Sequence, residues 1–295
     1  MSQRTFSYVQ MDVFASKPLE GNQLAVFTDA TGLSSEEMQA IARETNLSET
    51  TFIFPRTPSV EAKEGVKVRI FTTQEELKFA GHPTLGTAWQ LAASRGTDAI
   101  ELDLPVGKIP LEFRRENGRL QYGEMRQRDP EFGKVHDPEA VAIALGLGVG
   151  DLDPSVPIQT VSTGMPFAMV PFRSLRRLQE FSLFWPKAAE YLAKTDAKFF
   201  YLVSRETSQP EATLHARMIF YNGEDPATGS AAGCCTGWAV KHGVLESEKQ
   251  GMIEQGIEMH RPSKIYMRAT QTADSVKDIR IGGSAVQIFR GEASL

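Results

Sequence analysis

Three ionisable side chains stand in sequence contexts that suit proton-transfer chemistry. Glu49 lies in the segment NLSETTF and directly precedes an apolar run that is expected to form a strand. His82 occupies the turn AGHP, and Asp225 occupies the turn GEDPATGS. Apolar surroundings disfavour the charged carboxylate, so Glu49 could exchange a proton near neutral pH. Two carboxylates and one imidazole therefore predict an acid/base site.

Each of these residues also has an ordinary structural interpretation. A serine and a glutamate at a strand start, as at Glu49, are common in surface turns, and a buried histidine such as His82 is often held by structural hydrogen bonds. Asp225 precedes a proline and has the residue type of a helix N-cap. Ser230 could bond a nearby carbonyl in the first turn of a helix. The acid/base interpretation depends on the turns that carry these residues.

Both turns come just before a segment of unusually small residues. Helices are expected at 84–93 and from about residue 229, and their side chains are mainly Ala, Gly, Thr and Ser. Small side chains allow a sheet to approach closely and wrap around a helix. The free N–H groups and the positive dipole end of such a helix bind anions. Two helix N-termini facing one cleft would thus hold a substrate carboxylate.

The two turns belong to an apparent internal duplication. Three pairs of segments match in the same order: 21–27 (GNQLAVF) with 164–170 (GMPFAMV), 68–71 (VRIF) with 217–220 (RMIF), and 83–88 (PTLGTA) with 227–232 (ATGSAA). The offsets between partners are all close to half the chain length. Chance similarity among short Gly- and Ala-rich segments is the alternative. The pattern predicts one domain over residues 1–120, completed by a C-terminal strand at 281–295, and a second over 121–280.

The expected elements give an α+β fold with mainly antiparallel strands and one small-residue helix in each half. Ser34 and Glu37 have capping-box spacing and predict a helix start. Further helices are expected around 174–194. Glycines at 146–150 follow a helical pattern and are interpreted as a helix end.

Composition excludes several classes of partner. The net charge of −5 gives no electrostatic basis for binding nucleic acid or an anionic membrane. No apolar run reaches 18 residues, and the first residues lack a signal-peptide core, so a cytoplasmic protein is expected. The only cysteines are the neighbours Cys234 and Cys235, which fit a reducing compartment and are expected to pack as small hydrophobic residues.

Other catalytic motifs are missing from the sequence. The five histidines are scattered without zinc-site spacing, so no metal is expected. Ser230 does not stand in a G-x-S-x-G motif, and the chain has neither a P-loop nor a dinucleotide-binding GxGxxG segment. No cofactor is expected.

Several blocks of the sequence resemble the PhzF family of phenazine biosynthesis. They are MDVFASKPLEGNQLAVF, NLSETTFIF, FTTQEELKFAGHPTLGTAW, STGMPFAMVP, ARMIFYNGEDPATGSAAG and EQGIEMHRPSKI, and they run in order over most of the chain. This family is similar in fold to diaminopimelate epimerase, which implies two pseudo-symmetric domains, each a mainly antiparallel β-roll around a central helix, with the active site between them. The resemblance agrees with the duplication.

The resemblance implies a cofactor-independent isomerase that moves a proton on a small carboxylate, such as a dihydro-hydroxyanthranilate or another cyclic or amino-acid-like acid. By motif, Glu49 corresponds to the catalytic acid/base, and His82 and Asp225 to residues that position the substrate and assist the transfer. The residues that correspond to substrate contacts are Gly81, Thr228, Gly229, Ser230 and Asn22. Racemases of this fold use two cysteines, and the equivalent turns here carry His82 and the TGSA segment, which disfavours a two-cysteine mechanism. Homodimers are common in the family.

Residues that choose the substrate are expected elsewhere in the cleft. The candidates are Asn22, Gln23, Arg69, Met165, Arg217 and Tyr221. The alternative function is a catalytically silent protein that binds a small metabolite at the same anion-binding turns. The presence of Glu49, His82 and Asp225 favours the enzyme over the binding protein, because a pure binding site needs the N–H groups but no acid/base residue.

Overall fold

The computed structural model describes residues 3–221 and 223–295; residue 222, within the motif ARMIFYNGEDPATGSAAG, lies outside the described residues. The chain forms two compact units. Unit 1 comprises Met1–Arg126 and Gly282–Leu295, and unit 2 comprises Gln127–Ile281. A boundary at residue 120 would fall inside a strand, Arg119–Arg126, which belongs entirely to unit 1.

Unit 1 is built from nine strands and three helices among its described residues. They are β1 (Thr5–Val13), β2 (Asn22–Phe27), α1 (Ser35–Thr45), β3 (Glu49–Phe54), α2 (Pro58–Glu64), β4 (Val66–Phe71), β5 (Glu76–Leu77), α3 (Gly81–Arg95), β6 (Ala99–Leu104), β7 (Gly107–Glu116), β8 (Arg119–Arg126) and β18 (Ala285–Ser294). The last strand, β18, pairs antiparallel with the first, β1.

Unit 2 repeats this plan with different insertions. Its described elements are β9 (Glu131–Val135), α4 (Pro138–Leu145), the short 3₁₀ helix η1 (Val149–Asp151), β10 (Gln159–Ser162), β11 (Pro166–Phe172), α5 (Leu175–Gln179), α6 (Trp185–Leu192), β12 (Phe199–Ser204), β13 (Leu214–Phe220), β14 (Gly223–Asp225), α7 (Gly229–Lys241), β15 (Gly251–Gln255) and β16 (Ser263–Gln271). The strand β17 (Val276–Gly283) runs from unit 2 into the final segment of unit 1.

Strand pairing shows the duplication directly. The pairs β2–β3 and β4–β6 of unit 1 are parallel, as are β11–β12 and β13–β15 of unit 2. The pairs β3–β4 and β6–β7 are antiparallel, as are β12–β13 and β15–β16. Because the two units share order, direction and partners, the predicted α+β fold with two pseudo-symmetric halves is confirmed.

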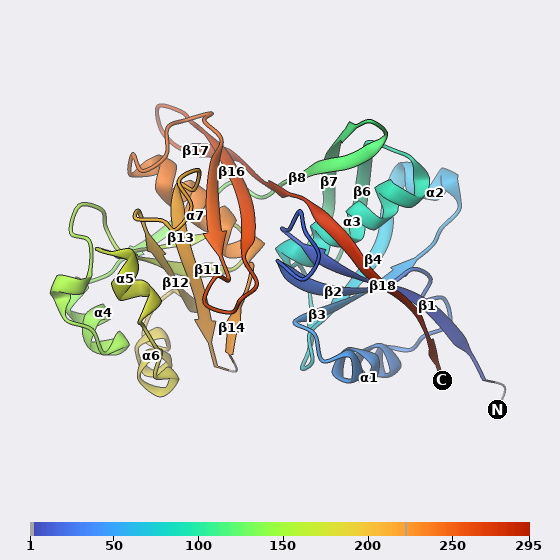
Figure 1. Cartoon of the computed structure of the whole chain (residues 1–295), viewed down its shortest axis with the longest axis horizontal. Helices are drawn as coiled ribbons and strands as arrows, with labels where there is room; N and C mark the ends of the chain where they lie inside the picture. The colour runs from blue at the N-terminus through green and yellow to red at the C-terminus, as the bar shows by residue number, and fades with distance from the viewer. Residues whose placement is uncertain (1–2, 222) are drawn as a thin grey trace. The chain divides into compact units, whose positions relative to one another are not determined.

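A small-residue helix lies at the centre of each unit (Figure 1). In unit 1, α3 packs against β1, β2, β3, β6, β7 and β8, and in unit 2, α7 packs against β10, β11 and β16. A Cβ added at Gly86 would lie 2.6 Å from both Leu24 and Val13, and one at Gly237 would lie 2.9 Å from Pro130. The small residues therefore allow the strands to enclose each helix.

Local signals explain most of the helix boundaries, with one correction. The capping box of Ser34 and Glu37 is present at α1, and Gly146 ends α4 in the left-handed conformation. The helices expected around 174–194 are α5 and α6, and Pro186 lies in the first turn of α6. However, α3 begins at Gly81 and not at residue 84, so His82 lies inside the first helical turn.

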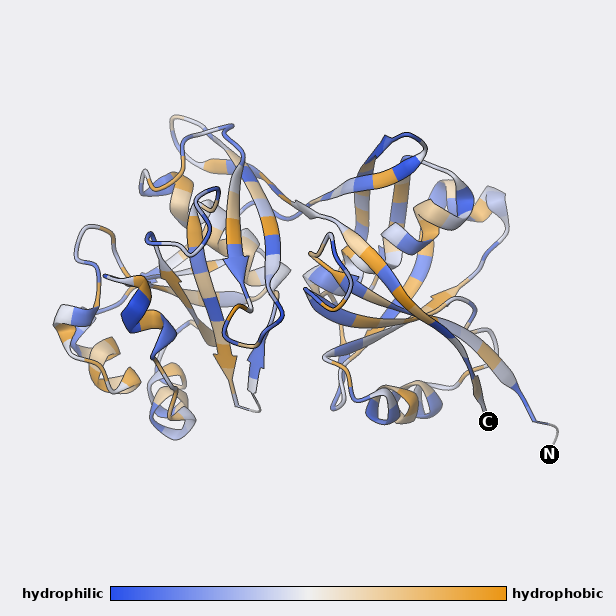
Figure 2. Cartoon of the chain, in the orientation of Figure 1, coloured by the Kyte–Doolittle hydropathy of each residue, from blue (hydrophilic) through white to orange (hydrophobic). Residues whose placement is uncertain are grey.

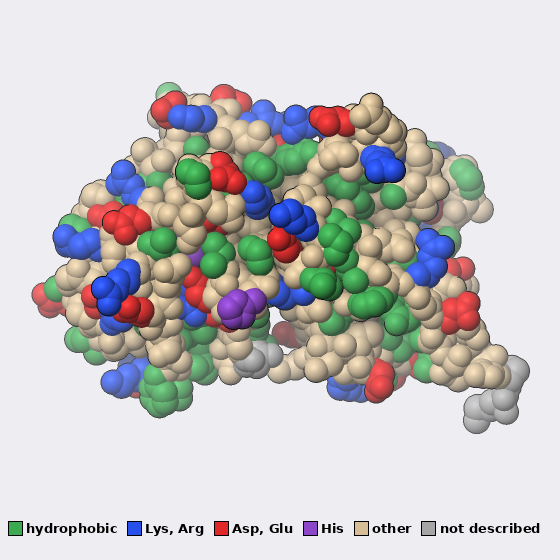
Figure 3. Space-filling view, in the orientation of Figure 1, with side chains coloured by type: hydrophobic (Ala, Val, Ile, Leu, Met, Phe, Trp, Pro, Cys, Tyr) green, Lys and Arg blue, Asp and Glu red, His purple; other side chains and the backbone are tan. Residues whose placement is uncertain are grey.

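Alternating burial matches the strand pattern. Along β16 every second residue is buried, and Figure 2 shows hydrophobic and hydrophilic residues alternating on this strand. Acidic and basic side chains are interspersed over the face seen in Figure 3. Across residues 3–221 and 223–295, the helices are all too short or too polar to cross a membrane.

Candidate active site

The predicted site residues fall into two groups, one in each unit. In unit 1, Glu49 begins β3 and His82 is the second residue of α3. The His82 Nε2 atom lies 3.3 Å from Glu49 Oε2. On the other side of the ring, Asn22 Nδ2 lies 3.1 Å from His82 Nδ1. The contact between His82 and Glu49 lacks hydrogen-bond geometry, whereas the Asn22 amide can donate to His82 Nδ1 when that nitrogen carries no hydrogen.

Parallel pairing of β2 and β3 brings these residues together. Leu24 is the register partner of Glu49, so Asn22 at the start of β2 lies close to the start of β3. Gly21 precedes Asn22 with φ of 69°, and a Cβ there would clash with the Val13 carbonyl oxygen. Only glycine fits this turn, which sets the entry of β2.

His82 is an uncharged imidazole at neutral pH. Its exposed fraction is 3%, and burial lowers the pKa of His82 to about 3, although a hydrogen bond with the Gln23 backbone acts in the opposite direction. Glu49 keeps a small exposed fraction, 15% of its side chain. The pair thus combines a carboxyl that solvent or a ligand can reach with a neutral partner that orients it.

In unit 2, Asp225 ends β14, where Met218 of β13 is its antiparallel partner. Its Oδ2 atom accepts a hydrogen bond from Thr228 Oγ1 at 2.6 Å. The N-cap of α7 is Thr228. The interpretation of Asp225 as the helix cap is therefore wrong, because the chain turns for three more residues before the helix begins.

A buried glutamine that sequence analysis missed holds this turn. Gln255, at the end of β15, has no exposed surface. Its side chain bonds to the backbone oxygen of Asp225, to the backbone and side chain of Thr228, and to the hydroxyl of Tyr201. The residue stands in the segment EQGIEMHRPSKI, but nothing in its local pattern shows that it reaches the turn at 225–228.

Both central helices begin without a side-chain cap. Ala80 precedes α3 and Thr228 precedes α7, and neither side chain bonds to the first N–H groups of its helix. Gly81 and Gly229 are buried, whereas Ser230 is partly exposed in the first turn of α7. The anion-binding role of these two helix ends stays a prediction.

The candidates for substrate choice have varied environments. Arg217 is 7% exposed. Its guanidinium forms an ion pair with Glu224, with N–O distances of 2.8 and 2.7 Å, and donates hydrogen bonds to three backbone carbonyls. These bonds hold the guanidinium in place, and a role for Arg217 in substrate choice stays a prediction. Arg69 forms an ion pair with Glu76 at 2.6 Å. Tyr221 is 49% exposed and packs edge-on against Phe220.

Two other candidates lie beside predicted site residues. Gln23 follows Asn22 in β2, and its backbone bonds to His82. The carbonyl oxygen of Met165 accepts a hydrogen bond from Cys234 at 3.5 Å. Neither observation assigns a role in substrate choice.

The cysteine pair lies in the interior of α7. Cys234 and Cys235 are buried thiols. Burial raises the pKa of Cys234 to about 11 and raises the pKa of Cys235 further. Thiols of this kind are protonated at neutral pH and poorly reactive, in agreement with the expectation that they pack as small hydrophobic residues.

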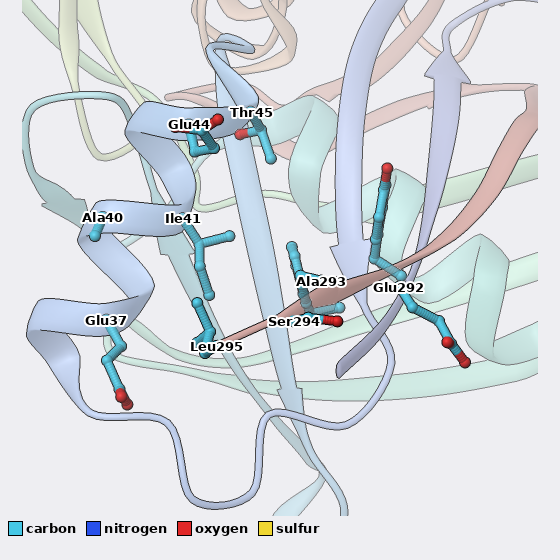
Figure 4. A pocket seen from close by; sticks show the side chains of 11 residues that line it. Glu37, Ala40, Ile41, Glu44, Thr45, Glu292, Ala293, Ser294 and Leu295 are labelled. Carbon is cyan, nitrogen blue, oxygen red and sulfur yellow. The ribbon is translucent and has the colours of Figure 1, made fainter. Parts of the chain in front are cut away.

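Two further features concern other kinds of ligand. Within the described part of the chain, no group of three or more His, Cys, Asp or Glu side chains could hold a metal ion. A cavity of about 640 Å³ lies in unit 1 between α1 and the end of β18 (Figure 4), with Tyr8, Phe27 and Ile41 among its apolar walls and Glu44 and Glu292 among its acidic ones. None of the predicted site residues lines this cavity.

Comparison with known proteins shows which family the chain belongs to. The profile of the PhzC-PhzF family, described as phenazine biosynthesis-like protein, matches residues 11–291. The chain belongs to this family. The chain is 35% identical to an uncharacterized isomerase of Mesorhizobium japonicum, over 98% of this chain and 99% of the relative.

Two further comparisons agree. The trans-2,3-dihydro-3-hydroxyanthranilate isomerase of Pseudomonas chlororaphis is 35% identical, over 96% of this chain and 98% of that enzyme. The crystal structure of a PhzF-family phenazine biosynthesis protein from Bacillus anthracis is 27% identical with a TM-score of 0.85, over 98% of this chain and 99% of its own. This PhzC-PhzF family chain is accordingly an isomerase.

Proposed function

We propose that this isomerase moves a proton between two carbon atoms of a small carboxylate substrate, by acid/base catalysis and without a cofactor. The observation that carries the proposal is the contact between Glu49 and the buried, neutral His82, 3.3 Å apart at the start of an uncapped helix. A carboxyl group oriented by a neutral donor is suited to accept a proton from carbon and return it.

The proposed reaction transfers a proton from one substrate carbon to another through Glu49. Glu49, as a carboxylate, takes a proton from carbon: the C–H bond breaks, an O–H bond forms, and the electron pair moves into the adjacent unsaturated system. The carboxylic proton exchanges with solvent, which reaches the partly exposed Glu49. The O–H bond then breaks as this proton is delivered to another carbon, where a new C–H bond forms. His82 orients the carboxyl during both steps, and Asp225 assists the transfer.

The second part of the proposal concerns the substrate carboxylate. We expect the N–H groups at Gly81 and at Gly229–Ser230 to act on one substrate, in a cleft between the two halves. Preorganised N–H donors stabilise negative charge that develops during proton abstraction. The uncapped starts of α3 and α7 support this assignment.

The substrate class is proposed from the chemistry of the site and from sequence similarity to a named enzyme. A cyclic or amino-acid-like acid with an activated C–H bond fits the acid/base pair, and the P. chlororaphis relative carries the name of an isomerase of trans-2,3-dihydro-3-hydroxyanthranilate. The test is an NMR assay in D₂O with this compound and a panel of dihydroaromatic acids and amino acids. Deuterium at a substrate or product carbon, dependent on enzyme, is the expected result.

Calorimetry on the same compounds distinguishes the proposed enzyme from a protein that only binds. Tight binding of panel members by calorimetry, with no deuterium incorporation in any of them, would contradict the proton-transfer proposal. Such a protein would bind its carboxylate at the helix starts and perform no carbon chemistry on the compounds tested.

A further inference from the structure

Gln255 forms a complete set of side-chain hydrogen bonds inside unit 2. Its Oε1 atom accepts from the hydroxyl of Tyr201 at 2.8 Å and from the backbone N–H of Thr228 at 3.3 Å. Its Nε2 atom donates to the backbone oxygen of Asp225 at 2.7 Å and to Thr228 Oγ1 at 3.0 Å. An amide has two donors and two acceptor lone pairs, so every bond that this side chain can make is made.

The two backbone partners determine the orientation of this amide. A backbone N–H can only donate and a backbone carbonyl can only accept. The Thr228 N–H therefore requires Oε1 on its side, and the Asp225 carbonyl requires Nε2 on the other. Rotating the amide by 180° would place two donors together and two acceptors together in a buried site, which costs about 1–3 kcal/mol for each unsatisfied group.

This orientation determines the direction of the next hydrogen bond. Because Thr228 Oγ1 accepts from Gln255, the hydroxyl hydrogen of Thr228 is available for its other neighbour, Asp225 Oδ2, at 2.6 Å. A hydroxyl–carboxylate bond of this length is charge-assisted and favours the ionised carboxylate in one rotamer. The order of donation is thus Gln255 to Thr228 to Asp225.

We propose that Gln255 is a positioning residue of the isomerase, which acts through Thr228 to fix the rotamer and the charged form of Asp225. The inference rests on the proposed role of Asp225 in proton transfer. Gln255 itself is fully buried, so it acts through the two residues of the turn and not on substrate.

The backbone around Gln255 is built to hold this contact. Gly256 follows it with φ of 77°, and a Cβ there would lie 2.6 Å from the Pro226 backbone oxygen. Ser263 Oγ donates to the same Pro226 oxygen at 2.7 Å. The residue before it, Glu254, pairs with the buried His215 at 2.8 Å. The end of β15 is therefore fixed on both sides of Gln255, as precise positioning requires.

The first test replaces Gln255 while keeping its volume. Gln255→Met removes all four bonds, and Gln255→Glu keeps the acceptors but replaces the two donors with negative charge next to Asp225. We expect deuterium exchange to fall at least tenfold in kcat for both variants, with KM changed less than threefold, because misplacing a catalytic group costs roughly one to two orders of magnitude. Ile253→Val, a buried change two residues away on the same strand, is the control and should keep the wild-type rate.

A double-mutant cycle tests the route through Thr228. Thr228→Val removes the hydroxyl that links Gln255 to Asp225. If the route is correct, Gln255→Met lowers the rate much less in the Thr228→Val background than in wild type. Independent, multiplicative effects of the two changes would overturn the proposal.

A measurement without turnover separates this inference from the proposed function. The carboxyl carbon of Asp225, assigned by comparison with Asp225→Asn, is titrated by ¹³C NMR in wild type and in Gln255→Glu and Thr228→Val. We expect a higher titration midpoint in both variants, and unchanged midpoints would overturn the inference. If wild type exchanges no panel compound, the proposed function fails, while the NMR titration still decides the role of Gln255.

Discussion

A buried histidine beside a carboxylate is ordinarily expected to hold its proton, because the negative charge favours the imidazolium. His215 follows this expectation. Burial alone would lower the pKa of His215, but hydrogen bonds to Glu254 and Glu258 outweigh it and raise the pKa. At His82 the balance is reversed: burial dominates and lowers its pKa to about 3. The same residue type thus has a raised pKa in one place and a lowered pKa in the other.

Removing the imidazole should therefore affect chemistry more than folding. His82→Leu deletes the ring contacts with Glu49 and Asn22, and we expect deuterium exchange to fall about a hundredfold, a typical loss for an acid/base partner. His82→Gln keeps one donor and one acceptor and should lose less. The control is His136→Gln, which alters a buried histidine bonded to Tyr191 and Thr160. Wild-type exchange by His82→Leu would exclude the proposed role.

The thiols provide a second prediction at this scale. Because burial keeps Cys234 and Cys235 protonated, iodoacetamide should label neither in the native enzyme at pH 7 and both in urea, as counted by mass spectrometry. The Cys234→Ala and Cys235→Ala variants should retain exchange within about threefold of wild type, since neither thiol takes part in the reaction. Inactivation by native-state alkylation would instead indicate cysteine-based proton transfer.

At the scale of elements, the helices α3 and α7 combine two tasks. Each is buried in the centre of its unit and begins at a turn that carries predicted site residues. The close contact with the strands requires residues without bulk, and Gly86 illustrates this, because a Cβ would lie 2.6 Å from Leu24 and Val13. A helix held on several sides by strands is a rigid support for the groups at its first turn.

The Gly86→Ala variant tests this packing. Alanine has the better helix propensity by about 1 kcal/mol, so an exposed position would be stabilised. Here overpacking should outweigh that gain and lower the free energy of unfolding by about 1–3 kcal/mol. Gly150→Ala, where the added Cβ meets nothing within 4 Å, is the matched control. Urea unfolding measures both, and a stabilised Gly86→Ala would show that the helix–strand contact is looser than described.

At the scale of the molecule, one histidine in each unit makes the stability of the fold depend on pH, and the two histidines act in opposite directions. His82 of unit 1 has a folded-state pKa of about 3, below its ordinary value of 6.5. The unfolded chain therefore binds one more proton between these values, and stability falls as pH drops below 6.5. His215 of unit 2 has a raised pKa, so its contribution is present below pH 6.5 and is lost as pH rises through the folded-state value.

Comparing wild type with His82→Gln isolates the contribution of His82 to the pH dependence of stability. Between pH 6 and pH 4.5, His82 should steepen the loss of stability by about 1.4 kcal/mol per pH unit, the slope for one proton. Urea denaturation of wild type and His82→Gln across this range measures the difference in slope. Parallel curves for wild type and His82→Gln would show that His82 titrates normally in the folded protein.

The sequence was sufficient for features that depend on local pattern. Ser34 and Glu37 predicted the start of α1, and the repeated segments predicted the two similar halves. Contacts between distant residues could not be predicted in this way. Gln255 bonds to a turn about thirty residues earlier, and Arg217 is held by Glu224 and by backbone carbonyls, so its charge is not available. Burial and partner geometry, which decide such roles, arise only when the strands assemble.

The most direct test of the central claim compares wild type with Glu49→Gln in D₂O. Glutamine keeps the shape of the side chain and can still bond to His82, but it cannot accept a proton from carbon. We predict that wild type incorporates deuterium into a substrate or product carbon, and that Glu49→Gln binds the same compound with similar affinity while exchange falls below detection. Exchange by Glu49→Gln at the wild-type rate would contradict the assignment of Glu49 as the acid/base.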